Sequence, residues 1–166
     1  MTSLAEYYLN SDRSVAEIDC IELSHPSFSK TFRHVRNVVQ GVTVRHEDGQ
    51  NYDYEYGPIV LGFLPSEESL DFGINVQLGD VGEIFAQEMD RIKLADNFLT
   101  VPIFTYRVYR SDNLLEALYP PIILEAKNFA STRQGVAYEA RPQNISTVGT
   151  GIDYNLNDFP TLRGFL

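Results

Sequence analysis

The stretch LDFGINVQL, residues 70–78, decides how the rest of the sequence is interpreted. Apolar and polar side chains alternate along it, and the apolar positions are Leu70, Phe72, Ile74, Val76 and Leu78. A period of two residues predicts a strand with one face in the core. The polar positions Asp71, Asn75 and Gln77 are expected to face away from that core.

Directly after this strand the pattern changes to helical spacing. Asp80, with Glu83 three residues later, matches the capping signature at the start of a helix. Apolar side chains then recur at Val81, Ile84, Phe85, Met89 and Ile92. We therefore expect one central amphipathic helix over about 80–94, and a second, short helix near the N-terminus that begins at Thr2 or Ser3.

Most of the remaining sequence predicts strands and turns. Residues 42–56 predict a hairpin that reverses at His46–Gly49, because an Asp-Gly pair tolerates the positive φ of a tight turn. Residues 59–64 are a short apolar run bounded by Pro58 and Pro65. A further strand is expected from Pro102 to Val108, and an antiparallel pair at 122–127 and 136–140. Hairpins in series with one long helix indicate an α+β, mainly β fold, either an antiparallel β-sandwich or a partly open barrel.

The strand expected at Val15–Leu23 changes its alternation near Ile21–Glu22. Ile18 and Cys20 lie on one phase of the pattern, whereas Ile21 and Leu23 lie on the other. Either a β-bulge or a change of packing partner along the strand would explain the shift. The sequence leaves both explanations open.

The composition limits the classes of protein to which this chain can belong. The chain has 166 residues, of which 43% are hydrophobic and 22% charged, as expected for one globular domain over 1–166. The alternation fades after Pro142, so residues 143–166 are expected to form an extended C-terminal arm. A net charge of −10 argues against non-specific nucleic-acid binding. No apolar stretch approaches the roughly 20 residues that span a bilayer.

No motif predicts catalysis, a cofactor or a metal site, so we expect a protein that is not an enzyme. Cys20 is the single cysteine and is expected to be a packed thiol. The histidines at positions 25, 34 and 46 lack the short spacing of metal ligands, and we expect surface turn residues instead. Acidic residues around 153–158 resemble a calcium loop only loosely, because the required glycine and closing glutamate are missing.

Aromatic residues are abundant: ten tyrosines and ten phenylalanines occur without tryptophan. Tyr52, Tyr54 and Tyr56 share one face of the predicted hairpin. They form either a ladder of cross-strand pairs or a subunit interface, where tyrosine is favoured. Apolar side chains of the C-terminal segment are further interface candidates: Tyr154, Phe159, Leu162, Phe165 and Leu166.

Four segments, taken in order, resemble a family of small minor tail or tail-tip proteins of long-tailed bacteriophages. They are the turn Leu23-Ser24-His25-Pro26, the Tyr-rich segment Tyr52–Leu64, the strand Phe72-Gly73-Ile74-Asn75-Val76, and the ending Asp158–Leu166. The likeness covers roughly residues 18–166. The larger minor tail proteins of this kind also carry a cysteine-rich cluster-binding region, which this chain lacks.

The resemblance implies a structural subunit of a tail tip or baseplate hub, in a ring between the tail tube and the receptor-binding end. It implies a homo-oligomer, a trimer or hexamer, that contacts distal tail, hub and tail tube proteins. DNA would only pass through the channel. The protein would be made in the host bacterial cytoplasm and reside in the virion. The alternative is a small β-domain virion-associated hydrolase or carbohydrate-binding module.

Overall fold

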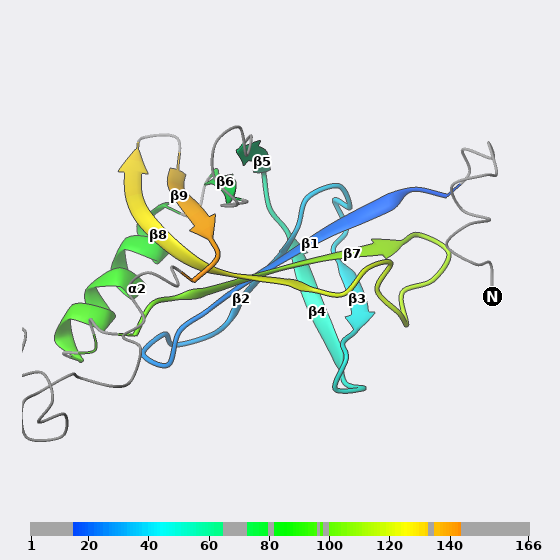
Figure 1. Ribbon diagram of the computed structural model, residues 1–166, viewed down its shortest axis with the longest axis horizontal. Helices are drawn as coiled ribbons and strands as arrows, with labels where there is room; N and C mark the ends of the chain where they lie inside the picture. Colours follow the sequence, from blue (N-terminus) through cyan, green and yellow to red (C-terminus); the bar gives the residue numbers. More distant parts are fainter. Residues whose placement is uncertain are drawn as a thin grey trace, which may run out of the picture.

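Figure 1 shows a computed structural model of the chain, which describes residues 15–64, 73–79, 82–95, 97, 100–132 and 135–143. The fold is mainly β with a single described helix, as the sequence predicts. The elements are β1 (Glu17–Ser24), β2 (Phe32–Val35), β3 (Val42–Arg45), β4 (Asn51–Tyr56), β5 (Ile59–Leu64), β6 (Gly73–Leu78), α2 (Gly82–Leu94), β7 (Ile103–Arg110), β8 (Ile122–Thr132) and β9 (Gly135–Arg141).

The nine strands form one open sheet in the order β3-β4-β2-β1-β7-β8-β9-β6-β5. All neighbours are antiparallel except β2 and β4, which run parallel over a short register, His34↔Glu55 and Val35↔Tyr56. The prediction of a wholly antiparallel sheet is therefore wrong at this pair. After β2 the chain continues into β3, and the β3–β4 hairpin then reverses it. As a result, β4 runs in the same direction as β2.

Two residues link the opposite ends of this sheet. β4 lies next to one end and β5 lies at the other, yet only Gly57 and Pro58 separate them in the chain. The Gly57 N–H donates to the Val35 carbonyl of β2 at 3.0 Å, and the Pro58 carbonyl accepts from the Gly79 N–H after β6 at 2.9 Å. The sheet therefore curls until its two ends meet at this link.

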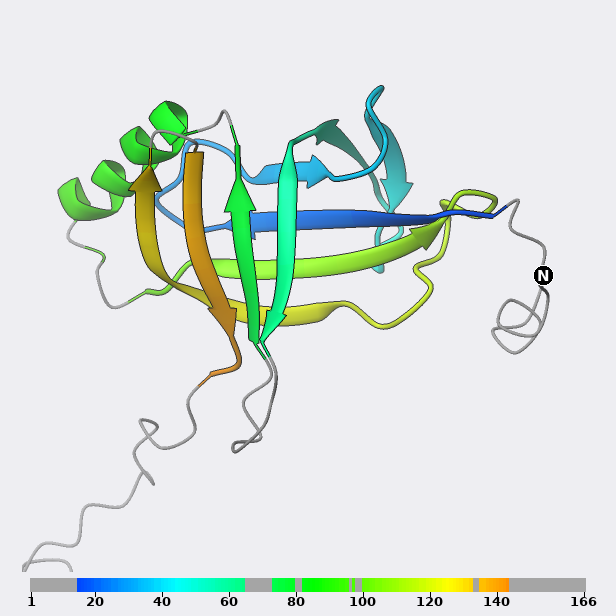
Figure 2. The same cartoon turned by 90° about the horizontal axis from the view of Figure 1, so that it is seen from above.

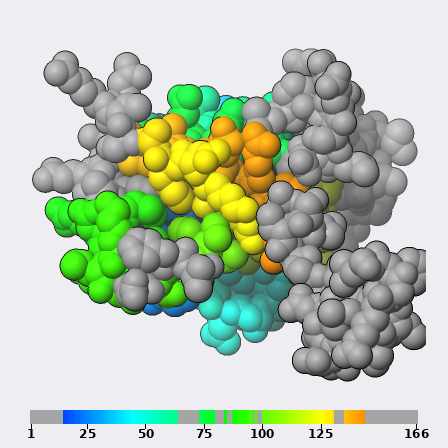
Figure 3. Space-filling view, turned by 60° about the vertical axis from the view of Figure 1, so that its left-hand side comes forward, coloured from blue at the N-terminus to red at the C-terminus, as the bar shows by residue number. Residues whose placement is uncertain are grey.

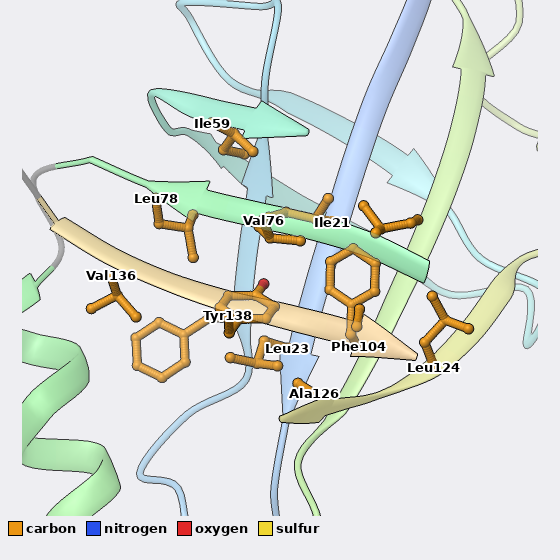
Figure 4. Packing of buried hydrophobic residues seen from close by; sticks show 13 residues of the cluster. Ile21, Leu23, Ile59, Val76, Leu78, Phe104, Leu124, Ala126, Val136 and Tyr138 are labelled. Atoms are coloured by element: carbon orange, nitrogen blue, oxygen red, sulfur yellow. The ribbon is translucent and has the colours of Figure 1, made fainter. Parts of the chain in front are cut away.

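The curl places one part of the sheet over another. Figure 2 shows β9, β6 and β5 side by side, crossing over β1 and β7. Figure 4 shows the side chains between these layers, with Phe104 and Tyr138 in contact near the centre. The first core consists of Ile21, Leu23, Phe32, Ile59, Ile74, Val76, Leu78, Phe104, Leu124, Ala126, Val136, Tyr138 and Ala140.

A second, smaller core lies on the opposite face of β1, beneath the β3–β4 hairpin. It contains Ile18, Cys20, Val35, Val44, Tyr54 and Tyr109. β1 contributes Ile18 and Cys20 to this core and Ile21 and Leu23 to the first one. Its pairing with β7 continues without interruption from Glu17↔Arg110 to Ser24↔Ile103. The shift of alternation in β1 is thus a change of packing partner and not a bulge.

Strand β6 confirms the central part of the predicted alternation. Ile74 and Val76 are fully buried and Leu78 is nearly so, while Asn75 is half-buried and Gln77 is exposed. The predicted positions 70–72 lie outside the described residues. The strands predicted at 122–127 and 136–140 are confirmed as β8 and β9, and the apolar run at 59–64 forms β5. The 42–56 hairpin is confirmed, with Gly49 at φ 80° in its turn.

Helix α2 confirms the predicted helix from Gly82 to Leu94 and packs beside β8 and β9 (Figure 3). Ile92 is buried and Met89 packs against the first core, but Ile84 is 51% exposed, contrary to the helical pattern. Glu88 is buried instead, because the Ser29 N–H and hydroxyl donate to its carboxylate at 2.8 and 2.5 Å. The cap at Asp80 and the N-terminal helix lie outside the described residues.

We predict that Phe104→Ala lowers the free energy of unfolding by about 3–5 kcal/mol, because it leaves a large cavity in the first core. Phe104 is fully buried, and its ring centroid lies 6.0 Å from that of Tyr138. Urea denaturation measures the change. The control is Ile123→Ala on the neighbouring strand β8, where the side chain is 63% exposed. Equal losses for the two variants would contradict the assignment of this core.

Candidate interaction surface

The structure separates the three tyrosines that the sequence groups together. Tyr54 is 2% exposed and belongs to the second core, Tyr52 is half-buried, and Tyr56 is 44% exposed. Tyr52 and Tyr54 lie opposite Val44 and Val42 of β3, and Tyr56 is the most exposed of the three. The other interface candidates, Tyr154, Phe159, Leu162, Phe165 and Leu166, lie outside the described residues.

Tyr56 owes its position to the packing of the β3–β4 hairpin on the sheet. Tyr54 and Val44 of the hairpin are buried against Cys20, Val35 and Tyr109. Burial raises the pKa of the Cys20 thiol to about 12, with a further contribution from the Asp19 carboxylate. The thiol is therefore protonated and enclosed, which agrees with the predicted packed cysteine. The Tyr109 hydroxyl donates to the Arg45 carbonyl at 2.8 Å and holds the end of β3.

A buried arginine fixes the tip of the hairpin. The Arg107 Nε and Nη2 atoms of β7 donate to the Glu47 carboxylate at 3.2 Å. Its Nη1 lies 3.7 Å from Glu22 Oε2 and donates to the Tyr54 hydroxyl at 3.5 Å. Only 10% of the Arg107 side chain is exposed. Glu22 is also held by Arg33, whose Nε donates to it at 2.9 Å.

Aromatic stacking continues this polar network on its outer side. The Arg33 guanidinium lies 4.4 Å from the Tyr52 ring centroid, and the His46 ring lies 4.2 Å from the same ring. The Tyr52 hydroxyl donates to Asp48 at 2.7 Å, and His46 Nε2 is 3.0 Å from the Tyr54 hydroxyl. Charge-assisted bonds and ring contacts thus secure the hairpin at several points. No local sequence pattern indicates this network, because its members come from β1, β2, β4, β7 and the hairpin turn.

The prediction of three surface histidines is wrong. His25, His34 and His46 are 7%, 8% and 9% exposed. His25 accepts from the Ser27 N–H at its Nδ1 and bonds the Thr100 carbonyl through Nε2, so it joins two loops. Burial lowers the pKa of His34, and burial together with the nearby Arg107 charge lowers that of His46. Local turn patterns led to the error, because burial here comes from residues distant in the sequence.

These polar groups do not gather as metal ligands do. Within the described ranges, no group of three or more His, Cys, Asp or Glu side chains is placed to hold an ion. The described part of the chain also contains no helix long and apolar enough to cross a membrane.

An apolar strip runs along the outside of the bent β4–β5 segment. We define the apolar strip as Val39, Tyr56, Pro58 and Val60, of which Val39 is 71% and Val60 58% exposed. A groove of about 490 Å³ contains Val39 and Tyr56, with Asp53 and Glu55 also in its lining. A second groove of about 310 Å³ contains Pro58 and Val60 and reaches Gly135 of β9. Shallow grooves beside exposed apolar residues suit a protein partner.

A separate groove of about 390 Å³ lies at the hairpin tip. Arg45, His46 and Glu47 line one wall, and residues 115–121 line the other. Leu115 and Tyr119 of that second wall are 67% and 38% exposed. Arg45 and the loop are joined by a bond from the Arg45 N–H to the Leu114 carbonyl at 2.9 Å.

The two edges of the sheet differ. At β3, four residues long, Arg45 uses its N–H for Leu114 and its carbonyl for the Tyr109 hydroxyl, so part of this edge is covered. At the other end, β5 has a neighbour on one side only among the described strands. Its sequence, IVLGFL, carries no charge. Natural edge strands usually carry charges or bulges that prevent pairing with another chain. Within the described sheet β5 carries neither, and we call it the receptive edge.

The model of one protein family, described as Domain of unknown function (DUF1833), matches residues 9–147. The chain therefore belongs to this family. A search of curated proteins gave no match to the sequence. The family match covers every described element from β1 to β9 and stops shortly after β9.

We predict that Arg107→Met lowers the free energy of unfolding by roughly 2–4 kcal/mol, because it leaves Glu22 and Glu47 without their shared cation. The pair Lys93–Asp90 provides the control, because its side chains are 66% and 64% exposed. Lys93→Met should change stability by less than about 0.5 kcal/mol. Chemical denaturation at pH 7 measures both. If Arg107→Met lowers the free energy of unfolding no more than Lys93→Met does, the network contributes little to stability.

We also predict that stability falls as the pH drops from 7 to 5. The pKa values of His34 and His46 are lowered by folding, so below about pH 6.5 the unfolded chain binds protons that the folded chain does not. Folding also lowers the pKa values of Glu47 and Glu88, but from the ordinary glutamate value of about 4.5, so their effect on stability belongs mainly to pH values below this window. Urea midpoints at pH 7, 6 and 5 measure the slope. His34→Gln should reduce it, and an unchanged slope in a His34→Gln, His46→Gln variant would contradict the assignment.

Proposed function

We propose that this protein is a structural subunit of a bacteriophage tail tip or baseplate hub, where it forms part of a homo-oligomeric ring. The observation that carries the proposal is the receptive β5 edge beside the apolar strip. An uncharged edge strand and exposed apolar side chains on one side of the molecule are features of a chain that completes its fold with a partner. The tail-tip assignment itself comes from the sequence resemblance.

The curled sheet is also suited to this role. We propose that it acts as a partly open barrel, in which the link at Gly57–Pro58 holds the two ends of the sheet together. Such a body keeps the exposed strip rigid, because Tyr56 is held by its pairing with Val35 of β2 and Val60 by the β5–β6 ladder. A rigid surface limits the ordering cost when subunits bind each other. The ring, a trimer or a hexamer, would contact distal tail, hub and tail tube proteins.

The charge of the chain supports a place around a DNA channel. A net charge of −10 disfavours retention of DNA, so DNA would pass through the ring without specific binding. Catalysis, cofactors and metals have no part in this function. The protein would be made in the host cytoplasm and incorporated into the virion at the tail tip.

The test begins with particles purified from cells that carry the gene. Immunogold labelling against this protein should mark the distal end of the tail, and the protein should co-purify with tail proteins. Its absence from particles, or labelling confined to the head, would contradict the proposal. Hydrolysis of cell-wall glycan or tight sugar binding by the purified chain would favour the hydrolase or carbohydrate-binding alternative.

A truncation tests the role of the C-terminal arm. Deletion of Phe159–Leu166 should leave a soluble, folded monomer that no longer assembles into tails, because these residues would contact an adjacent subunit. Circular dichroism and sedimentation measure folding and association, and electron microscopy measures assembly. Unfolding of the truncated chain would instead show that the arm packs on its own domain, and normal tails would show that these residues do not act in assembly.

A further inference from the structure

We propose that the groove of about 490 Å³ beside the β3–β4 hairpin binds an extended segment of another tail protein, in which basic residues at alternate positions stand next to apolar ones. We call it the acidic groove, because Asp53 and Glu55 lie in its lining with Val39, Val42 and Tyr56. This inference rests on the proposed function for the source of the partner, which is taken from among the proteins of the tail. It adds the chemistry of that partner and the residues that recognise it.

The acidic groove exists because the turn before β3 passes close to β4. Gly41 in this turn has a φ of 74°, and its N–H donates to the Val38 carbonyl at 3.0 Å. A Cβ atom at position 41 would lie only 2.7 Å from the Tyr54 carbonyl oxygen, so a side chain there would force the two backbones apart. Glycine thus lets the turn lie against the strand, where Val39 forms part of the groove.

The two carboxylates share the outer face of the hairpin. Tyr54 lies between them in the chain and is buried in the second core. Side chains alternate along a strand, so Asp53 and Glu55 both point away from that core, and both are exposed. The Thr43 hydroxyl donates to Asp53 Oδ1 at 2.6 Å and so engages one oxygen of that carboxylate. Alternate residues of a strand lie roughly 7 Å apart, which is also the spacing of alternate side chains in an extended partner.

The charge of the acidic groove is not compensated by the described part of the chain. No Lys or Arg side chain among the described residues forms an ion pair with Asp53 or Glu55. His34 lies opposite Glu55 in the pairing of β2 with β4, but burial lowers its pKa and it is mainly neutral at pH 7. A segment with two cations at alternate positions is therefore the electrostatic complement of this groove.

Apolar side chains continue the surface beside the carboxylates. Val39 is 71% exposed and Tyr56 is 44% exposed, and the apolar strip continues from Tyr56 to Pro58 and Val60. A purely basic segment would leave these side chains in water, so the partner needs apolar residues next to its basic ones. The Tyr56 ring also offers a face on which an arginine of the partner can stack.

A different protein suits the acidic groove better than a second copy of this chain. The chain has a net charge of −10, and eight of the ten Lys and Arg side chains in its described part already form ion pairs with its own carboxylates. To place one of these cations in the groove of a neighbour would break an existing pair. Nucleic acid is disfavoured as well, because its phosphates would meet the same carboxylates.

Binding of a synthetic peptide to the full-length chain tests the chemistry of the groove. The probe is a fluorescent peptide with arginine at two alternate positions followed by leucine and phenylalanine, and fluorescence anisotropy measures its dissociation constant. One control peptide carries citrulline, the uncharged analogue of arginine, and another carries serine in place of both apolar residues. We expect roughly tenfold weaker binding of each control, and weaker binding of the probe as salt is added. No binding of the probe, or equal binding of all three peptides, would overturn the proposal.

Matched substitutions in the protein locate the bound peptide. Glu55→Gln removes one charge of the acidic groove, and Glu116→Gln removes an exposed charge from the separate groove at the hairpin tip. Val39→Ser and Leu115→Ser form a second pair, because these side chains are 71% and 67% exposed. We expect Glu55→Gln and Val39→Ser each to weaken binding at least about fivefold, and the two controls less than about twofold. Equal effects within either pair would place the peptide elsewhere and overturn the proposal.

Cross-linking in purified tail particles identifies the natural occupant. A photoreactive amino acid replaces Val39 or, as the control, Leu115, and mass spectrometry identifies the linked segment. From position 39 we expect a segment of another tail protein with alternate basic residues next to apolar ones, and from position 115 no link to that segment. Links from position 39 to this chain itself, in the same or another copy, or to no protein at all, would overturn the proposal. Absence of the protein from particles would instead contradict the proposed function, and the peptide experiments would still judge the groove.

Discussion

The arrangement of the whole sheet depends on the two residues that join β4 to β5. Gly57 is bonded to β2 through its N–H, and Pro58 is bonded to the residue after β6 through its carbonyl. A Cβ atom at position 57 would lie 3.3 Å from the Cβ, Cγ and Nδ1 atoms of His34, so a larger residue there would push the imidazole aside by a few tenths of an ångström. Proline at the next position fixes φ at the bend. Because the link is so short, the strands at the two ends of the sheet cannot move apart.

Both cores follow from this constraint. When the two ends are held together, the layer of β9, β6 and β5 must cross over β1 and β7, and the first core fills the space between them. The β3–β4 hairpin is then left on the opposite face of β1, where the second core forms. β1 is shared by the two cores, which is why its buried residues change phase in mid-strand while its pairing with β7 stays regular. The shift of alternation in the sequence therefore arises because β1 packs against two different cores.

The features that could be predicted from the sequence are those with a local period. Alternation located β6, β8 and β9, helical spacing located α2, and the Asp-Gly pair located the hairpin turn. The sequence does not predict the parallel pairing of β2 with β4, because this pairing depends on how the β3–β4 hairpin folds back onto the sheet. The burial of the histidines and the role of Arg107 were missed for the same reason: Arg107 lies 60 residues from Glu47, and neither residue has a pattern that indicates the other. Of the apolar strip, the sequence pattern includes Tyr56, whereas the exposure of Val39 and Val60 has no local pattern that indicates it.

The difference between the two sheet edges limits how copies of this chain can associate. Arg45 has its backbone groups engaged by Leu114 and Tyr109, so part of the β3 edge is closed to a second chain. A pair of β5 strands related by a two-fold axis would satisfy the receptive edge, but it would use up both edges and end as a dimer. A donor from elsewhere in the chain leaves every copy with one donor and one acceptor, and such head-to-tail contacts close into a ring when the rotation between neighbours permits. A ring joined by strand pairing at β5 would therefore need a donor strand from outside the described sheet.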